Sequence, residues 1–111
     1  MTGLIKDKEK INKIIFEKIM GKRLIFTDHY LISSTEKGID DEKVKNIFYK
    51  FDKIYAIEKE TLKFGDIGYE LFYELDDNTY FSIATIPKKD ILLIVHAVEY
   101  KRDLSKRFKE K

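Results

Sequence analysis

Four β-rich runs joined by short turns fill the second half of the chain, and they constrain its fold more than any other feature. The runs are rich in Ile, Leu, Val, Tyr and Phe and cover residues 54–62, 69–75, 80–86 and 91–99. Turn-forming residues separate them: Gly65 and Gly68, then Asp77 and Asn78, then Pro87 to Asp90. Because connections this short force neighbouring strands to run antiparallel, we expect a four-stranded antiparallel sheet. The last run is apolar on both faces, which is typical of a strand covered by helices.

The first apolar pattern in the chain predicts an amphipathic helix over residues 4–20. Apolar side chains recur there at spacings of three and four with lysines opposite, and they are Leu4, Ile11, Ile14, Ile15 and Ile19. Gly21 follows in the position favoured for a left-handed helix end. A basic amphipathic helix can also lie on a membrane or bind a partner. The stripe is aliphatic and has no Trp, however, so we expect it to pack on the sheet.

A short strand and a helical hairpin are expected between that helix and the sheet. Residues 22–26 form an apolar run of strand length, and Thr27 or Asp28 then caps a helix that ends near Gly38. A third helix follows over residues 41–51, with a buried face of Val44, Ile47, Phe48 and Phe51. A DNA-binding helix-turn-helix has a similar pattern, but this helix carries only lysines and lacks Arg and Gln for base contacts.

The size and composition of the chain indicate one α+β domain over residues 1–111. It has 111 residues, of which 43% are hydrophobic, and no segment is rich enough in Pro, Gly or Ser to be a linker. Within this domain we distinguish an extra N-terminal helix (1–21), a core (22–100) and a basic tail or short helix (101–111).

Cysteine is absent, which excludes disulfide frameworks, thiolate metal sites and cysteine nucleophiles, and which fits a reducing compartment. The first ten residues lack a signal-peptide pattern, and no apolar run is long enough to span a bilayer, so we expect a cytoplasmic protein without membrane attachment. Nineteen lysines against three arginines, with no Gln or Cys, are typical of proteins from hot environments. AT-rich coding gives the same bias.

Positive charge is concentrated at both ends of the chain. Residues 1–23 carry seven Lys or Arg against three acids, and residues 101–111 carry six against two. The segment between them carries nine basic and fifteen acidic residues. If the two ends meet in space, they form a basic patch suited to phosphate or to an acidic partner. Charged ends that only keep the protein in solution are the plainer interpretation.

Two histidines could carry acid–base chemistry. His29 lies just inside a predicted helix start and His96 lies in an apolar strand, and a structural hydrogen bond would explain either of them as well. No spacing of ligands indicates a metal site, and we predict neither a metal nor another cofactor. A metal-dependent nuclease that uses His29 or His96 with Asp or Glu is kept as an alternative.

Four glutamates recur along the predicted strands at intervals of two and four, so each pair shares a sheet face: Glu58, Glu60, Glu70 and Glu74. Paired carboxylates can do acid–base work. A solvated strand face balanced by lysines such as Lys59 and Lys63 is the more ordinary interpretation.

The segment after the last strand, residues 100–108, contains the most suggestive group of side chains. Basic groups there could hold RNA phosphates, and they are Lys101, Arg102, Lys106 and Arg107. Lys101, Arg102 and Arg107 could also neutralise charge in a phosphodiester-cleavage transition state, and Tyr100 could stack on a base. These three and Tyr100 are the candidate catalytic residues. A basic tail without catalysis is the alternative.

Short motifs at both ends of the core resemble those of the RelE/ParE toxin superfamily. The sequence FTDH at residues 26–29, with Gly38-Ile39 after it, is similar to poorly characterised relatives that share a Phe-Thr-x-His start and a later Gly-Ile. Residues 95–104 resemble the final strand and the Arg-Arg-Asp-like tail of the toxins. The order of strand, helical hairpin, antiparallel strands and basic tail is similar as well. The resemblance covers about residues 22–107, and the helix at 4–20 is additional to it.

This resemblance implies a toxin-like core over residues 22–100. The superfamily includes ribosome-dependent messenger-RNA endonucleases and gyrase poisons, usually neutralised by a small antitoxin. We therefore expect activity on RNA or the ribosome, an antitoxin partner, and active-site roles for Lys101, Arg102 and Arg107. The alternative is a noncatalytic interaction module that forms a homodimer or a partner complex, because no catalytic constellation is visible and the N-terminal helix is extra.

Overall fold

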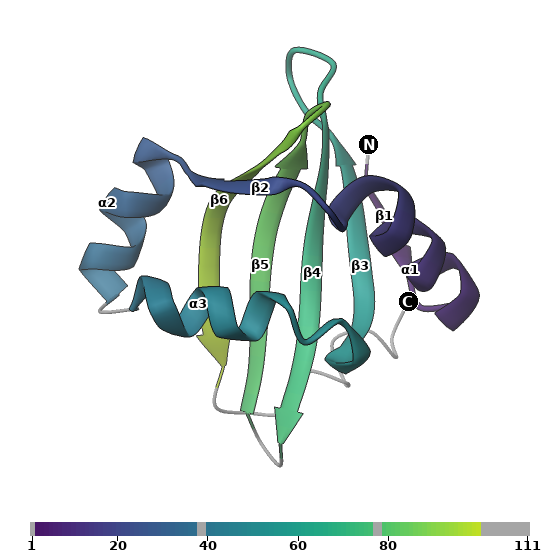
Figure 1. Cartoon of the computed structure of the whole chain (residues 1–111), viewed down its shortest axis with the longest axis horizontal. Coiled ribbons are helices and arrows are strands. Elements are labelled where there is room, and N and C mark those ends of the chain that lie inside the picture. Colours follow the sequence, from purple (N-terminus) through teal and green to yellow (C-terminus); the bar gives the residue numbers. More distant parts are fainter. Residues whose placement is uncertain (1, 38–39, 77–78, 101–111) are drawn as a thin grey trace.

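The computed structural model describes residues 2–37, 40–76 and 79–100, which form a six-stranded sheet in the order β1-β3-β4-β5-β6-β2 (Figure 1). The strands are β1 (Thr2–Ile5), β2 (Arg23–Phe26), β3 (Ile54–Thr61), β4 (Ile67–Asp76), β5 (Thr79–Pro87) and β6 (Ile91–Tyr100). The helical segments are α1 (Lys8–Ile14), the π-helix η1 (Ile15–Ile19) that continues it, α2 (Asp28–Lys37), α3 (Asp41–Phe48) and the 3-10 turn η2 (Phe51–Lys53). The protein therefore has the expected α+β class.

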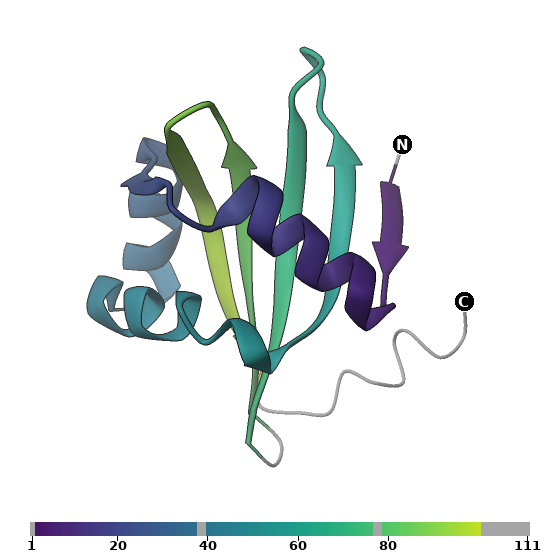
Figure 2. The same ribbon diagram turned by 45° about the vertical axis from the view of Figure 1, so that its right-hand side comes forward.

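The sheet is larger than expected, and it is mixed. The four predicted runs are present as β3 to β6, each antiparallel to the next. Strand β1 joins β3 at one edge, and β2 joins β6 in parallel at the other. Between them, α1 and η1 run diagonally across the sheet (Figure 2). The expectation of a four-stranded antiparallel sheet was wrong because both edge strands have only four residues and find their partners far away in the sequence.

Strand β1 replaces the first turn of the helix predicted for residues 4–20. Leu4 lies in β1 and packs on the face of the sheet away from the helices. The helix begins only after Asp7, whose carboxylate accepts a hydrogen bond from the Lys10 N–H at 3.1 Å. This bond satisfies one of the N–H groups that a first helical turn leaves without a partner. At the other end Gly21 has φ +80°, which confirms the predicted left-handed helix end.

Replacing Asp7 with Ala is expected to lower the free energy of unfolding by about 1 kcal/mol, the usual cost of losing a helix cap. Urea unfolding followed by circular dichroism measures this difference. Asn12→Ala is the matched control, because Asn12 is exposed in the same helix and its side chain caps nothing there. Equal stability of the Asp7 variant and the parent would contradict the role of Asp7 as the cap.

The main core lies between the helices and one face of the sheet. The helices contribute side chains that are each at most 4% exposed: Ile11, Ile15, Ile19, Tyr30, Val44, Ile47 and Phe48. The buried faces predicted for the first and third helices are thereby confirmed, apart from Leu4 and the half-buried Ile14 and Phe51. The Tyr73 hydroxyl donates to the Phe48 carbonyl at 2.8 Å, and its burial raises the Tyr73 pKa. Tyr73 therefore ties the end of α3 to the sheet as a neutral donor.

The opposite face of the sheet, which we call the second face, carries a smaller apolar cluster. It consists of Ala56, Phe72 and Tyr80, with Leu4, Tyr55 and Tyr100 packed against them. Among the described residues no helix lies on this face (Figure 2). The expectation that helices cover both faces of the last strand was therefore wrong. The apolar residues on its second face pack on neighbouring strands instead.

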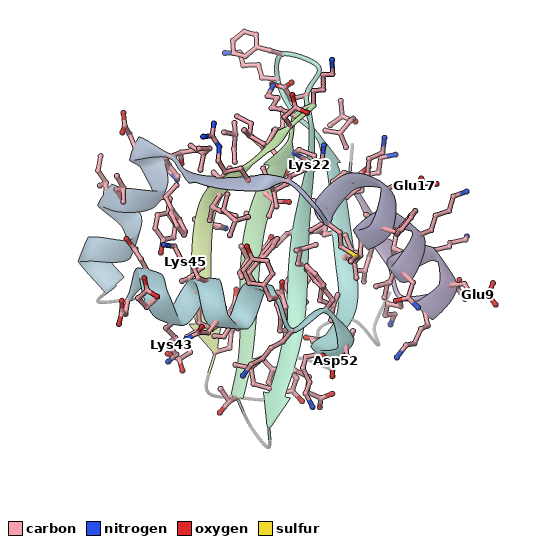
Figure 3. The ribbon with its side chains drawn as sticks, in the orientation of Figure 1. Glu9, Glu17, Lys22, Lys43, Lys45 and Asp52 are labelled. Atoms are coloured by element: carbon pink, nitrogen blue, oxygen red, sulfur yellow. The ribbon has the colours of Figure 1, made fainter. Side chains whose placement is uncertain are left out.

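Two of the three predicted turns lie within the described residues. Gly65 has φ +91° and donates its N–H to the Leu62 carbonyl at 3.0 Å, as a turn glycine should. In the turn between β5 and β6, the Lys22 ammonium donates to the carbonyls of Lys88 and Lys89 (Figure 3). Among the described residues as a whole, no helix is both long and apolar enough to cross a lipid bilayer. The other predicted features lie outside the described residues: Gly38, Asp77 and Asn78.

Candidate functional site

A β-bulge decides which side chains of β6 face the second face. Ala84 of β5 lies opposite His96, whereas the next residue of β5 lies opposite Ile94, so Val95 is an extra residue in β6. In a regular strand Ile94 and His96, two positions apart, would point the same way. With the bulge, Ile94 (0% exposed) and Ala97 (2% exposed) both enter the core. His96 is thereby turned to the second face.

A cleft of about 280 Å³ opens on the second face beside this bulge. Its histidine and glutamate lining residues come from α2, β3, β4 and β6, and they are His29, Glu58, Glu60, Glu70 and His96. We call it the histidine–glutamate cleft. It brings both histidines of the chain into one place, together with three of the four glutamates that the sequence pattern assigned to shared sheet faces.

The register of the sheet places Glu70 and His96 in one row. Glu70 lies opposite Ala84, and Ala84 lies opposite His96. Because Ala84 is small, the two longer side chains can meet above it, and His96 Nε2 lies 3.8 Å from Glu70 Oε2. The side chains are 33% and 24% exposed. At this distance the contact is an ion pair only when His96 is protonated, and it is too long for a hydrogen bond.

Thr27 brings His29 to the same cleft. The Thr27 hydroxyl donates to the Ile94 carbonyl at 3.0 Å and accepts from the Tyr30 N–H at 3.1 Å. The Thr27 N–H also donates to the Ile94 carbonyl, at 3.1 Å. Thr27, one of the two predicted caps, therefore fixes the start of α2 to β6 at the residue where the bulge begins. The exposed His29 lies in the first turn that follows.

The cleft is acidic. Glu58 lies directly opposite Glu70, so their carboxylates share the second face. The sequence pattern paired glutamates only within each strand and did not predict this cross-strand pair. Lys59 was expected to balance these charges, but side chains alternate along a strand, and Lys59 lines a hollow on the helix side. No Lys or Arg is among the described residues that line the cleft. A cationic group for this site must come from elsewhere.

The chemistry available in the cleft is proton transfer. Imidazole and carboxylate groups can both donate and accept protons near neutral pH when their surroundings suit it. The Thr85 hydroxyl, also in the lining, donates to the Tyr69 carbonyl at 2.7 Å and is engaged in structure. Within the described residues no group of three His, Cys, Asp or Glu side chains is placed to hold a metal ion. General acid–base chemistry is therefore what the arrangement of side chains offers.

Of the candidate catalytic and RNA-binding residues chosen from the sequence, the structure describes only Tyr100. Lys101, Arg102, Lys106 and Arg107 lie outside the described residues. Tyr100 is the last residue of β6 and lies opposite Tyr80, in the apolar cluster of the second face and not in the cleft lining. Sequence reasoning considered His29, His96 and Glu70 separately and missed that they converge. The sequence gives no signal for this convergence, because the last run is apolar at almost every position and its bulge appears only in the sheet register.

Comparisons of the chain with protein families, with curated proteins and with solved structures found no match. The functional argument therefore depends on the geometry described above and on the resemblance of the short motifs.

Proposed function

We propose that this chain is a RelE/ParE-like, toxin-related protein that acts on RNA at the ribosome, with the histidine–glutamate cleft as its site of proton transfer. The contact between His96 and Glu70 is the observation that carries the proposal, because it places an imidazole and a carboxylate, two groups that transfer protons, side by side in the cleft. The order of β2, the helices α2 and α3, and the strands β3 to β6 supports it, since this is the order of elements in the resemblance. A fold resemblance alone would not fix the activity.

The proposed reaction is cleavage of an RNA strand by its own 2′-hydroxyl group. The 2′-oxygen attacks the adjacent phosphorus, its proton passes to a base, and the bond from phosphorus to the 5′-oxygen breaks as an acid protonates that oxygen. The products are a 2′,3′-cyclic phosphate and a free 5′-hydroxyl. His96, whose Nε2 lies 3.8 Å from the Glu70 carboxylate, is assigned the role of the acid. His29, the other histidine of the cleft, is assigned the role of the base.

The attacked phosphate gains negative charge, and an acidic cleft cannot stabilise it. The proposal therefore assigns that role to Lys101, Arg102 and Arg107, which follow the last strand in the sequence. Lys106 would contribute to RNA binding, and Tyr100 to stacking on a base. An antitoxin that covers the cleft or these cations would neutralise the protein.

Strong expression in a bacterial host is expected to arrest growth and translation, and Arg102→Ala combined with Arg107→Ala should restore growth. The physical reason is that the transition state loses its cationic partners. Plating efficiency and incorporation of labelled amino acids measure the effect. Lys109→Ala with Lys111→Ala is the matched control, because it removes the same charge from the same segment. Healthy growth and intact messenger RNA in cells that express the unmodified protein strongly would contradict the proposal.

A noncatalytic interaction module is the second candidate function. The observation that favours it is an apolar pair on the outer side of η1 and the residue after it, where Phe16 is 75% and Met20 is 48% exposed. Large apolar side chains one helical turn apart are a common feature of protein contacts. This candidate predicts a homodimer or a complex with a partner protein that depends on these two side chains.

A further inference from the structure

A second hollow, lined by lysines, lies between the first helix and strand β3 on the helix side of the sheet. Its volume is about 280 Å³, and its charged lining residues are Lys10, Lys13, Glu17, Lys18 and Lys59. Three of these lysines come from α1 and η1, and the fourth comes from β3. We call it the lysine hollow. Glu17, its one acidic side chain, is labelled on η1 in Figure 3.

Helix periodicity and sheet register explain why these lysines converge. Positions 10, 13 and 17 follow at spacings of three and four, which places them on one side of the helix. Lys18 lies five positions after Lys13, which is about one turn in the π-helix η1, and so faces the same way. Lys59 lies opposite Gly3 of the edge strand β1, and open space surrounds the position where a Gly3 side chain would be. The Lys59 side chain thus extends beside the helix without obstruction from β1.

The positive charge of the lysine hollow is not compensated by ion pairs. Three lysines elsewhere on the described surface have carboxylate partners within 4.0 Å: Lys43, Lys45 and Lys88. None of the four lysines of the hollow forms such a pair within the described residues. The four lysines and one glutamate give the lining a net charge of about three positive units at neutral pH. This positive charge is therefore available to bind a polyanion.

Tyr69 adds a neutral hydrogen-bond donor to the lining of the hollow. It is only 6% exposed, and its hydroxyl makes no hydrogen bond to another described residue. Burial raises the Tyr69 pKa, and the negative charge of Glu17 raises it further, so the hydroxyl keeps its proton. The hydroxyl is therefore free to donate a hydrogen bond to a ligand oxygen in the hollow.

We propose that the lysine hollow binds the phosphate backbone of single-stranded RNA, an inference that rests on the proposed function and names the surface that holds its substrate. Lysine ammonium groups contact phosphates without reading bases, so this binding is independent of sequence and sensitive to salt. The acidic cleft alone would repel a phosphate chain. Lys59 lies between Glu58 and Glu60 in β3, so an RNA strand that passes around the β1 edge reaches both faces of the sheet.

The test measures binding of a labelled twelve-nucleotide oligouridine by fluorescence anisotropy over a series of salt concentrations. The double variant Lys13→Gln with Lys59→Gln is expected to bind at least about tenfold more weakly, and the slope of log affinity against log salt should fall by about 1.4, since each phosphate contact to a single strand contributes about 0.7. The matched control is Lys50→Gln with Lys63→Gln, which removes two exposed lysines elsewhere and should leave affinity within about twofold.

Three outcomes would overturn the inference: no binding of oligouridine by the parent protein, equal losses in the two double variants, or oligoglutamate of equal charge competing as well as RNA. Circular dichroism establishes that the variants are folded. Cleavage of ribosome-bound messenger RNA is measured separately on the same proteins. Binding that depends on the lysine hollow without any cleavage by the parent supports the inference and contradicts the proposed activity. Cleavage by the parent protein, together with RNA binding that the lysine variants leave unchanged, supports the proposed activity and contradicts the inference.

Discussion

Replacing Ile15 with Asp is expected to unfold the protein. Ile15 is 3% exposed and belongs to the main core, between the sheet and the first helix. The variant loses the burial of a large apolar side chain and places an unpaired charge in its position, which together cost on the order of 5 kcal/mol or more. Because the whole free energy of unfolding of a small domain is about 5–15 kcal/mol, little or none would remain. Circular dichroism and urea unfolding measure the loss.

The neighbouring Phe16 provides the matched control, since it is 75% exposed in the same turn. Phe16→Asp should leave the free energy of unfolding within about 0.5 kcal/mol of the parent, as exposed substitutions usually do. A folded Ile15→Asp protein would contradict the packing of this helix on the sheet. Phe16→Asp also tests the noncatalytic alternative. If light scattering finds a dimer that Phe16→Asp dissociates while the protein stays folded, the interaction module gains support.

Replacing His96 with Gln is expected to slow cleavage of ribosome-bound messenger RNA by about 10²–10⁴-fold, the usual contribution of a general acid. Gln keeps a hydrogen-bonding side chain of similar size but cannot deliver a proton to the leaving oxygen. His96 is half-buried on the second face, outside the main core, so circular dichroism should show an unchanged fold. Initial rates on a radiolabelled messenger in programmed ribosome complexes measure the effect.

Glu70→Gln should reduce the same rate, because the Glu70 carboxylate lies 3.8 Å from His96 Nε2 and its negative charge positions the imidazole in the cleft. Glu74→Gln is the matched control, since Glu74 lies on the same face of the same strand and outside the cleft lining. If both variants lose the same fraction of the cleavage rate, the effect comes from surface charge and not from the contact between Glu70 and His96.

Predictability from sequence differed between the centre and the edges of the sheet. The strands β3 to β6 were predictable because β-rich runs joined by short turns leave antiparallel neighbours as the only arrangement. Strand β2 was predicted from its apolar run, but its parallel pairing with the remote β6 was not, and the four-residue β1 was missed. Leu4 fits a helical stripe and a strand equally well. The start of α1 depended on the Asp7 cap, which periodicity does not reveal.

The candidate site was predictable only in part. Alternation along each strand placed Glu58 with Glu60, and Glu70 with Glu74, on shared faces, whereas only the sheet register shows that Glu58 lies opposite Glu70. The same alternation places Lys59 on the other face of the sheet. The expectation that Lys59 balances the charge of these glutamates was wrong for that reason. The convergence of His29 with His96 depends on a bulge and on a side-chain bond from Thr27 to β6, neither of which a pattern of residue types specifies. The roles of Lys101, Arg102 and Arg107 stay predictions.

The chemical identity of the RNA ends tests the central claim most directly. Fragments produced from ribosome-bound messenger in the presence of EDTA should carry 5′-hydroxyl and 2′,3′-cyclic phosphate ends, because a pair of histidines needs no metal ion to move the two protons. The parent protein should form them and His96→Gln should not. Fragments with 5′-phosphate ends that disappear in EDTA, or an undiminished rate for His96→Gln, would contradict the assignment of catalysis to the histidine–glutamate cleft.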